Sequence, residues 1–207
     1  MRLEPARSTS VESFNFLRLL LLASILAGTS GVLSSVGSVG IGGGVHEVAS
    51  AGPTMLVATL RSGDGLAVIN ISTPISPSVA GSVTSSTYLD NARGVATSQN
   101  RNSSRAYVAA YSSNRLTVVD FTLWTNPVVE GSVEHATYLN GACAVAVSKA
   151  DPNYLVVVAG LNDGVAMVDV SNPRIPTIVG SKKDTRLMGA PIAVATHSDR
   201  AFVTSSG

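Results

Sequence analysis

Cysteine, charged residues and aromatic residues are all scarce in this sequence of 207 residues. Its single cysteine, Cys143, excludes an internal disulfide framework and a cysteine-rich zinc site. Charged residues make up 13% of the chain, and 14 Lys and Arg against 13 Asp and Glu leave a formal net charge of +1. Nucleic-acid binding depends on clustered cations that neutralise phosphates, so this balance gives no case for it. The 45% of hydrophobic residues is instead enough for a globular core.

The first residues differ in composition from the rest of the chain. Nine mainly apolar residues, 19–27, follow Arg18 and precede the small residues 28–30. As a helix they would rise about 14 Å, well short of a hydrocarbon core of roughly 30 Å. A basic flank, a short apolar run and then small residues are typical of a secretory signal. We therefore predict a signal peptide within residues 1–30 and a secreted or cell-surface protein.

Two other interpretations of this segment stay open. In one, residues 19–41 form an uncleaved, glycine-rich membrane anchor, which is the only contact with a membrane that we expect. In the other, the leader has no targeting meaning. In every case Gly42-Gly43-Gly44 is expected to act as a flexible joint. Residues 1–44 are then a leader, and the fold begins at Val45.

From Val45 onward the sequence repeats about every fifty residues, which is stronger evidence of architecture than any single residue. Three runs align at offsets of 50 and 49 residues, and each is followed by a proline seven residues on and then by a Gly-Ser pair: Leu66–Asn70, Leu116–Asp120 and Val165–Asp169. The length of the repeat changes only where Ser98 to Tyr107 faces Ser148 to Val156, which predicts an exposed loop at that point.

Each repeat has the sequence of four short strands joined by turns, because β-branched residues are frequent and the apolar runs are only four to six residues long. In the third strand, Leu116, Val118 and Val119 put apolar side chains on both faces, so this strand needs one layer above it and another below. Four-stranded antiparallel sheets stacked radially meet that need. We predict an all-β, β-propeller-like fold, with a β-solenoid or sandwich as the alternative.

The number of repeats is small for such a fold. Residues 45–207 hold a little over three units, and the last unit ends after its second strand. Propellers close with roughly four to eight blades. An open arc would leave about five large apolar side chains uncovered and forfeit on the order of 8 to 15 kcal/mol, which is comparable to the net stability of a domain. We therefore expect either a truncated chain with missing blades or self-association that closes the ring.

The repeated runs also resemble a known family, the LVIVD repeat. The residues that carry the resemblance are Leu66–Asn70, Leu116–Asp120, Val165–Pro173, the Gly-Ser steps and the entry segment Gly141–Val147. The likeness spans about residues 45–207, and it implies a propeller typical of secreted and cell-surface proteins, with an adhesion or scaffold role and no catalytic residues to transfer. Asn70 stands where the family has Asp, and Trp124 stands where it has Pro. Both weaken the turn signal locally and leave the register unchanged.

Residues at one repeat phase converge around the channel of a propeller, so a metal or catalytic cluster should recur in phase. The histidines occupy three different phases: His46 aligns with Ala96 and Ala146, His135 with Ser85, and His197 with Ser98 and Ser148. We therefore expect solvated loop histidines, no metal site and no cofactor.

Other polar residues have structural explanations. Asn70, Asp120 and Asp169 each end a strand before a turn, where an Asx side chain bonds its own backbone two residues on. A calcium site would need several carboxylates in one loop. Cys143, in the phase of Arg93 and Ile192, is expected to be a small buried thiol, because no histidine shares a phase that would activate it.

Binding is expected at the loops that enter the inner strands, where the phase is kept while the residues differ. The candidate interaction residues are Asp90, Asn91, Arg93 and Asn140, and ordinary solvated turns are the alternative. Asn102, in an Asn-Ser-Ser sequon of the variable stretch, is the candidate glycosylation site.

These observations favour a non-enzymatic, exported scaffold that binds a protein or a glycan. The alternative is a piece of a propeller enzyme, a hydrolase or lyase, whose catalytic residues lie in missing blades. A cytoplasmic structural propeller is a third interpretation. In-phase His, Asp or Glu in further blades would favour the enzyme, whereas a sorting signal or an adhesion module would favour the scaffold.

Overall fold

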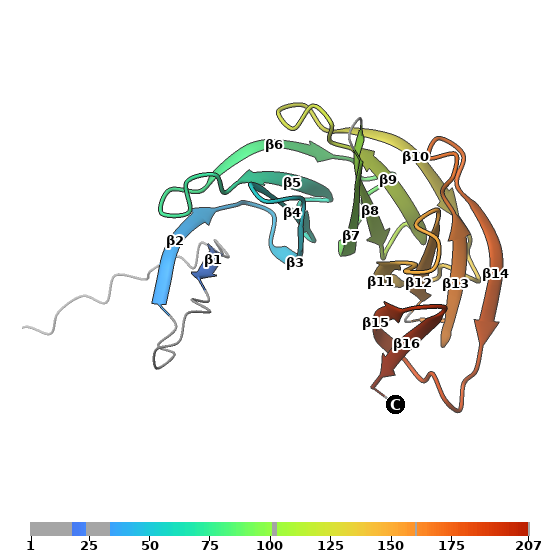
Figure 1. Cartoon of the computed structure of the whole chain (residues 1–207). Helices are drawn as coiled ribbons and strands as arrows, with labels where there is room; N and C mark the ends of the chain where they lie inside the picture. Colours follow the sequence, from blue (N-terminus) through green and yellow to red (C-terminus); the bar gives the residue numbers. More distant parts are fainter. Residues whose placement is uncertain (1–17, 24–33, 101–102, 160, 207) are drawn as a thin grey trace, which may run out of the picture.

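All the regular structure in the described residues is β-strand (Figure 1). The computed structural model describes residues 18–23, 34–100, 103–159 and 161–206. The strands are β1 Arg18–Ala23, β2 Ser34–Gly40, β3 Val45–Ser50, β4 Met55–Leu60, β5 Gly65–Asn70, β6 Ser78–Thr84, β7 Ala92–Asn100, β8 Ser103–Ala110, β9 Arg115–Asp120, β10 Val128–Glu134, β11 Ala142–Val147, β12 Tyr154–Ala159, β13 Gly164–Asp169, β14 Thr177–Lys183, β15 Pro191–His197 and β16 Arg200–Ser205. Within these ranges no helix has the length and hydropathy of a membrane span.

The strands form three complete blades, each an antiparallel four-stranded sheet in chain order: β3–β6 is blade 1, β7–β10 is blade 2 and β11–β14 is blade 3. Two-stranded sheets, β1–β2 and β15–β16, flank them. The blades fan out in an arc with β3, β7, β11 and β15 along its concave side and β6, β10 and β14 along its convex side (Figure 1). The arc stays open. The prediction of an all-β, propeller-like fold with incomplete closure is confirmed.

The third strand of a blade is buried on both faces, as its sequence predicts. In β9, Leu116 and Val118 pack in a cluster with side chains of blade 3, whereas Val119 packs in a second cluster with side chains of blade 1. All three side chains are completely buried. Met167, which holds the position of Val118 in blade 3, is 43% exposed because the sheet that follows blade 3 has only two strands. Radial stacking, in which each blade covers its neighbour, therefore accounts for the apolar pattern.

The polar residues at the ends of the third strands form turns, as predicted. The Oδ1 atoms of Asn70, Asp120 and Asp169 accept hydrogen bonds from backbone N–H groups two residues on, at 2.8, 2.7 and 2.8 Å. The hydrogen bonds from Ser171 lower the pKa of Asp169, because they stabilise its charged form. These side chains initiate the turn that leads to the outer strand of each blade.

The folded part of the chain begins earlier than the sequence predicts. Ile41 is only 5% exposed, and with Val39 it packs on the face of blade 1 that no other blade covers. The carbonyl oxygens of Gly43 and Gly44 accept hydrogen bonds of 2.9 to 3.0 Å from the backbone of the turn at residues 61–63. This segment therefore packs against the first blade, and the flexibility expected of Gly42-Gly43-Gly44 stays a prediction.

The variable stretch between repeats is also more regular than expected. Strands β7 and β8 continue into it and pair as far as Asn100 and Ser103, so most of the extra length is strand. The candidate glycosylation site Asn102 lies outside the described residues.

Candidate functional site

The loops that enter the inner strands are fixed to the preceding blade by a hydrogen bond that recurs at every blade boundary. The Oδ1 atoms of Asp64, Asn114 and Asp163 accept the backbone N–H of Asn91, Gly141 and Ala190 at 3.0, 2.9 and 2.9 Å. The acceptor lies in the turn between the second and third strands of one blade, and the donor lies in the entry loop of the next. We call this contact the Asx clamp.

Both members of each clamp have left-handed backbone conformations. The φ angles of the acceptors Asp64, Asn114 and Asp163 are 46°, 52° and 50°, and those of the donors Asn91, Gly141 and Ala190 are 54°, 67° and 45°. Asn, Asp and Gly tolerate this region better than other residues do. The clamp thus explains why Asx recurs in these turns, and it sets the direction in which each entry loop leaves the blade.

The structure brings two of the four candidate interaction residues into contact. Arg93 Nε lies 3.4 Å from Asn91 Oδ1, and the Asn91 amide donates a hydrogen bond of 3.1 Å to Ser112 Oγ. Asp90 and Asn140 hold one position in successive blades, and their backbone carbonyl oxygens accept the N–H of Ser112 and Leu161. The four residues therefore lie in equivalent loops, but the contact between side chains is confined to blade 2.

A cavity of about 270 Å³ lies beside these loops. Its lining includes His46, Arg93, Tyr111 and Cys143 together with the apolar residues Leu161 and Ile192. The Arg93 guanidinium carbon lies 3.4 Å from the centroid of the Tyr111 ring, in a cation–π contact that orients the side chain. The inner strands β3, β7 and β11 each contribute one residue and β15 contributes two, Pro191 and Ile192, so this is the place where in-phase positions converge.

The position of His46 corrects the sequence alignment. In β3, Val45 pairs with Leu60 and Val48 with Ala58, as Ala92 and Val95 of β7 pair with Ala110 and Val108. His46 thus has the phase of Arg93, Cys143 and Ile192 and does not have the phase of Ala96. The paired residues Val48 and Ala58 are ten positions apart, whereas the equivalent pair Val95 and Val108 is thirteen positions apart. The β3–β4 hairpin of blade 1 is therefore three residues shorter than the β7–β8 hairpin of blade 2. For this reason the fifty-residue offset does not apply to β3.

The charges of two arginines act on His46 in this cavity. Loss of hydration and the nearby charges of Arg93 and Arg61 all lower the pKa of His46, because each disfavours its charged form.

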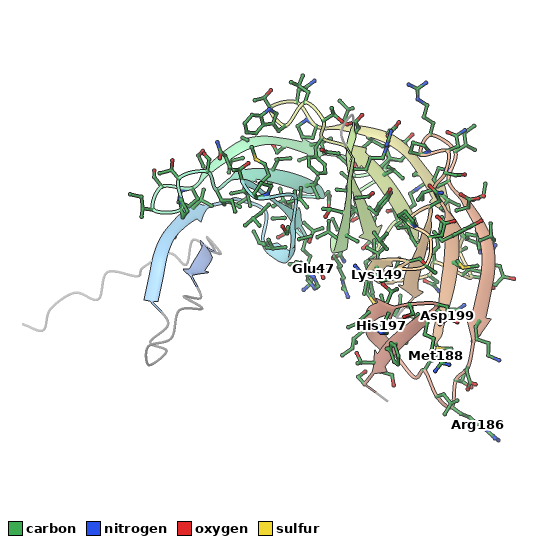
Figure 2. All side chains as sticks on the ribbon, in the orientation of Figure 1. Glu47, Lys149, Arg186, Met188, His197 and Asp199 are labelled. Carbon is green, nitrogen blue, oxygen red and sulfur yellow. The ribbon has the colours of Figure 1, made fainter. Side chains whose placement is uncertain are left out.

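Glu47, the residue after His46, lies on the concave side of blade 1 (Figure 2). Its carboxylate accepts the backbone N–H of Val95 at 2.9 Å, which ties blade 1 to blade 2. Loss of hydration nevertheless raises the pKa of Glu47.

Replacing Glu47 by glutamine is expected to remove one contribution by which stability falls as the pH rises. Because the pKa of Glu47 is raised above 4.5 in the fold, the folded state binds more protons than the unfolded state at pH values between the two pKa values. As the pH rises through this interval, the contribution of Glu47 to the free energy of unfolding therefore falls. Glutamine still accepts the Val95 N–H but does not titrate. Urea unfolding between pH 4 and 7 measures the slope, with Asp199→Asn, at an 81% exposed side chain, as the control. Parallel curves for wild type and Glu47→Gln would contradict this.

The thiol of Cys143 lies half-buried in the cavity, which agrees only in part with the expected buried thiol. Its Sγ donates a hydrogen bond to the carbonyl oxygen of Pro191 at 3.3 Å. The contact therefore links the Cys143 thiol to the entry of β15.

The remaining histidines have local contacts. His135 Nδ1 accepts the N–H groups of Thr137 and Tyr138, as Ser85 Oγ accepts the N–H of Tyr88 at the same phase of the preceding repeat. His197 ends β15 at the open end of the arc (Figure 2). In the part of the chain that the structure describes, no three His, Cys, Asp or Glu side chains lie close enough together to hold a metal ion.

Sequence reasoning missed the clamp residues Asp64, Asn114 and Asp163, although the signal was present. They recur at offsets of 50 and 49, directly before the third strand of each repeat. Tyr111 was also missed, because no aromatic residue recurs at its phase and its role depends on Arg93 alone.

Comparisons with known proteins support the architecture. A family model described as the LVIVD repeat matches residues 61–85 and 141–184. No curated protein matches the sequence. A solved structure of a protein from Lactobacillus plantarum is similar with a TM-score of 0.56 and 11% identity over 73% of this chain and 46% of that one. A protein from Bacteroides fragilis NCTC 9343, named a "putative 6-phosphogluconolactonase", gives 0.55 and 8% over 77% and 49%. The chain thus spans about half the length of these structures, and the likeness concerns the fold alone.

Proposed function

The chain carries LVIVD repeats, and on that premise we propose that it is a non-catalytic repeat scaffold that binds a partner at the mouths of its inner strands. One observation carries this proposal. Four in-phase residues, His46, Arg93, Cys143 and Ile192, come from four successive inner strands and line one cavity. A rigid frame that presents different residues at one recurring position is how repeat folds build binding surfaces.

The chemistry of the cavity favours a partner that carries a carboxylate. Arg93 is positioned on Tyr111, and Arg61 adds a second positive charge near His46. The nearby carboxylate of Glu47 is engaged by the backbone of Val95. An arginine guanidinium binds carboxylates through charge-assisted hydrogen bonds.

The apolar part of the lining favours a protein segment. Leu161 and Ile192 are 59% and 58% exposed beside the charged residues. An acidic side chain next to an apolar one in a peptide would fill both parts of the cavity, whereas an acidic glycan would leave these side chains in contact with hydroxyl groups. We therefore propose an acidic, partly apolar protein segment as the partner.

Replacing Arg93 by methionine is expected to weaken binding of acidic peptides by about tenfold or more, because hydrogen bonds to charged groups contribute about 1.5 to 3 kcal/mol. Wild type and variant are compared on an array of acidic peptides and uronic-acid oligosaccharides. Arg186→Met serves as the control, since Arg186 lies away from the cavity at the open end of the arc (Figure 2). Equal binding by Arg93→Met and wild type would contradict the site, and binding of the oligosaccharides alone would contradict a protein partner.

A hydrolase is the second candidate, and one observation favours it. His46 and Cys143 line the same cavity, although sequence alignment separated them. Hydrolysis of an ester or lactone that is lost in Cys143→Ser would favour the enzyme. The scaffold predicts no turnover and unchanged peptide binding in that variant.

Export to the cell surface stays a prediction from the apolar run at residues 19–27. It is tested by locating the protein and sequencing its mature N terminus. Cleavage near residues 27–30 would place the binding surface outside the cell.

A further inference from the structure

A second cavity lies between blades 1 and 2, at the strand ends opposite to the entry loops. Its volume is about 310 Å³. The lining comes from the turn between β3 and β4, from the start of β8 and from the turn that follows β9: Ala51, Gly52, Pro53, Thr54, Met55, Ser104, Phe121, Thr122 and Trp124. None of these residues belongs to the cavity beside the entry loops, so the two cavities are separate.

The cavity lies where two neighbouring hairpins differ in length. In blade 1 the pairing of β3 with β4 ends at Ser50 and Leu56, which are equivalent to Thr97 and Ala106 of blade 2. Three further pairs follow in blade 2: Ser98 with Arg105, Gln99 with Ser104 and Asn100 with Ser103. The β7–β8 hairpin therefore extends past the shorter β3–β4 hairpin, and Ser104 in this extension lines the cavity.

The cavity is bounded by residues of the packed core. Phe121 is only 3% exposed and belongs to the same buried cluster as Ala51 and Met55 of blade 1. The backbone N–H of Phe121 donates to the carbonyl oxygen of Ser104 at 3.0 Å, and the N–H of Ser104 donates to Thr122 Oγ1 at 3.0 Å. The boundary between the blades thus holds both sides of the cavity in place.

Trp124 is the exposed aromatic residue of the lining. It is the single tryptophan of the chain and is 43% exposed. The other two repeats have Pro74 and Pro173 at this position. The carbonyl of Trp124 meets Gly81 as the carbonyl of Pro173 meets Gly131, so either residue gives the same backbone packing. The turn therefore does not need the indole, whereas binding surfaces favour tryptophan for its large apolar face and its N–H donor.

The polar part of the lining is neutral. None of the lining residues carries a charge, and three of them carry hydroxyl groups: Thr54, Ser104 and Thr122. Thr122 Oγ1 accepts the N–H of Ser104, so its own proton is left to donate. A hydroxyl group both donates and accepts hydrogen bonds. A sugar ring carries the same groups on its rim and presents C–H groups on its faces, and it therefore matches both the hydroxyls and the indole.

We propose that this cavity binds a neutral hexose unit of a glycan, with a C–H face of the sugar ring on the indole of Trp124 and its hydroxyl groups bonded to Thr54 and Ser104. An acidic sugar would find no cation among the lining residues. A proline-rich peptide docks along a groove lined by several aromatic side chains, whereas Phe121 is buried and Trp124 is the one exposed aromatic residue of this lining. The volume is at the small end of ligand cavities, about 300 to 1,000 Å³, which favours a single ring.

The fluorescence of Trp124 tests the proposal directly, because the chain has no other tryptophan. The full chain is titrated with the methyl α- and β-glycosides of glucose, galactose and mannose, and separately with a decaproline peptide. At least one hexoside is expected to shift the emission in a saturable way and to protect the indole from quenching by acrylamide, and decaproline is not. The same titration of Arg93→Met should be unchanged, so that failure of the peptide site and failure of this site are distinguishable.

Variants of the turn separate the indole from the fold. Trp124→Pro introduces the residue of the other two repeats, so it should keep the urea midpoint of wild type while calorimetry shows binding weakened by about tenfold or more. Trp124→Phe keeps an aromatic face and should retain most of the affinity. Leu123→Ser is the matched control, since Leu123 is an exposed neighbour outside the lining. No response to any hexoside, protection by decaproline, equal binding by Trp124→Pro and wild type, or an equal loss in Leu123→Ser would each overturn the proposal.

Discussion

Replacing Asn114 by alanine is expected to lower the free energy of unfolding by about 2 to 4 kcal/mol. Asn114 has a φ of 52°, where an alanine costs roughly 1 kcal/mol or more. Its Oδ1 also accepts the N–H of Gly141, a buried residue, at 2.9 Å. Leaving a buried N–H without its acceptor costs about 1 to 3 kcal/mol. Urea unfolding followed by circular dichroism measures the change.

Two further variants separate these contributions. Asn114→Gly keeps the backbone conformation and removes the acceptor, so it should lose only the hydrogen-bond part. Asn114→Asp should be nearly neutral, because Asp64 and Asp163 make the same bond at the other two boundaries. If alanine and aspartate variants were equally stable, the Asx clamp would have no role in holding the blades together.

Much of the fold could be predicted because the apolar pattern of a single strand shows whether one or both of its faces are covered. The apolar residues Leu116, Val118 and Val119 showed that β9 is covered on both faces, and they do pack against two different blades. The turns at Asn70 and Asp120 were predictable for a similar reason, since an Asx turn depends only on residues next to it in the chain.

The candidate site was harder to predict because it depends on how hairpin lengths shift the register. His46 lines the cavity with Arg93 only because the first hairpin is three residues shorter, and a fixed repeat offset cannot show this. The contact of Arg93 with Tyr111 likewise depends on the Asx clamp, which sets the path of the entry loop.

The N-terminal segment shows a different limit of sequence reasoning. The leucines at 19–22 have neither the alternation of a half-buried strand nor a polar residue to mark a face. Composition predicts a targeting segment here, and this stays a prediction; the pairing of β1 with Ser34–Gly40 follows the register of the other blades, which composition does not show. The Gly37-Ser38 pair is the one signal in the sequence that would have extended the repeat to this point.

The contact between the Gly-Ser step and the next blade tests radial stacking most directly. A Cβ atom on Gly131 would overlap the backbone carbonyl of Pro173 and lie 2.6 Å from that of Arg174, both in blade 3. Backbone atoms cannot turn aside as a side chain can, so Gly131→Ala should push the blades apart and cost about 3 kcal/mol, at the upper end of overpacking effects. Gly40→Ala is the matched control, because nothing lies within 4 Å of its Cβ position.

The decisive measurement is the urea midpoint of these two alanine variants against wild type, at one protein concentration. The stacked arrangement predicts a clearly lower midpoint for Gly131→Ala and an unchanged or slightly higher one for Gly40→Ala, since alanine restricts the unfolded chain more than glycine does. If Gly131→Ala were as stable as Gly40→Ala, blade 3 would not lie against blade 2 at this position, and the radial stacking described above would be contradicted.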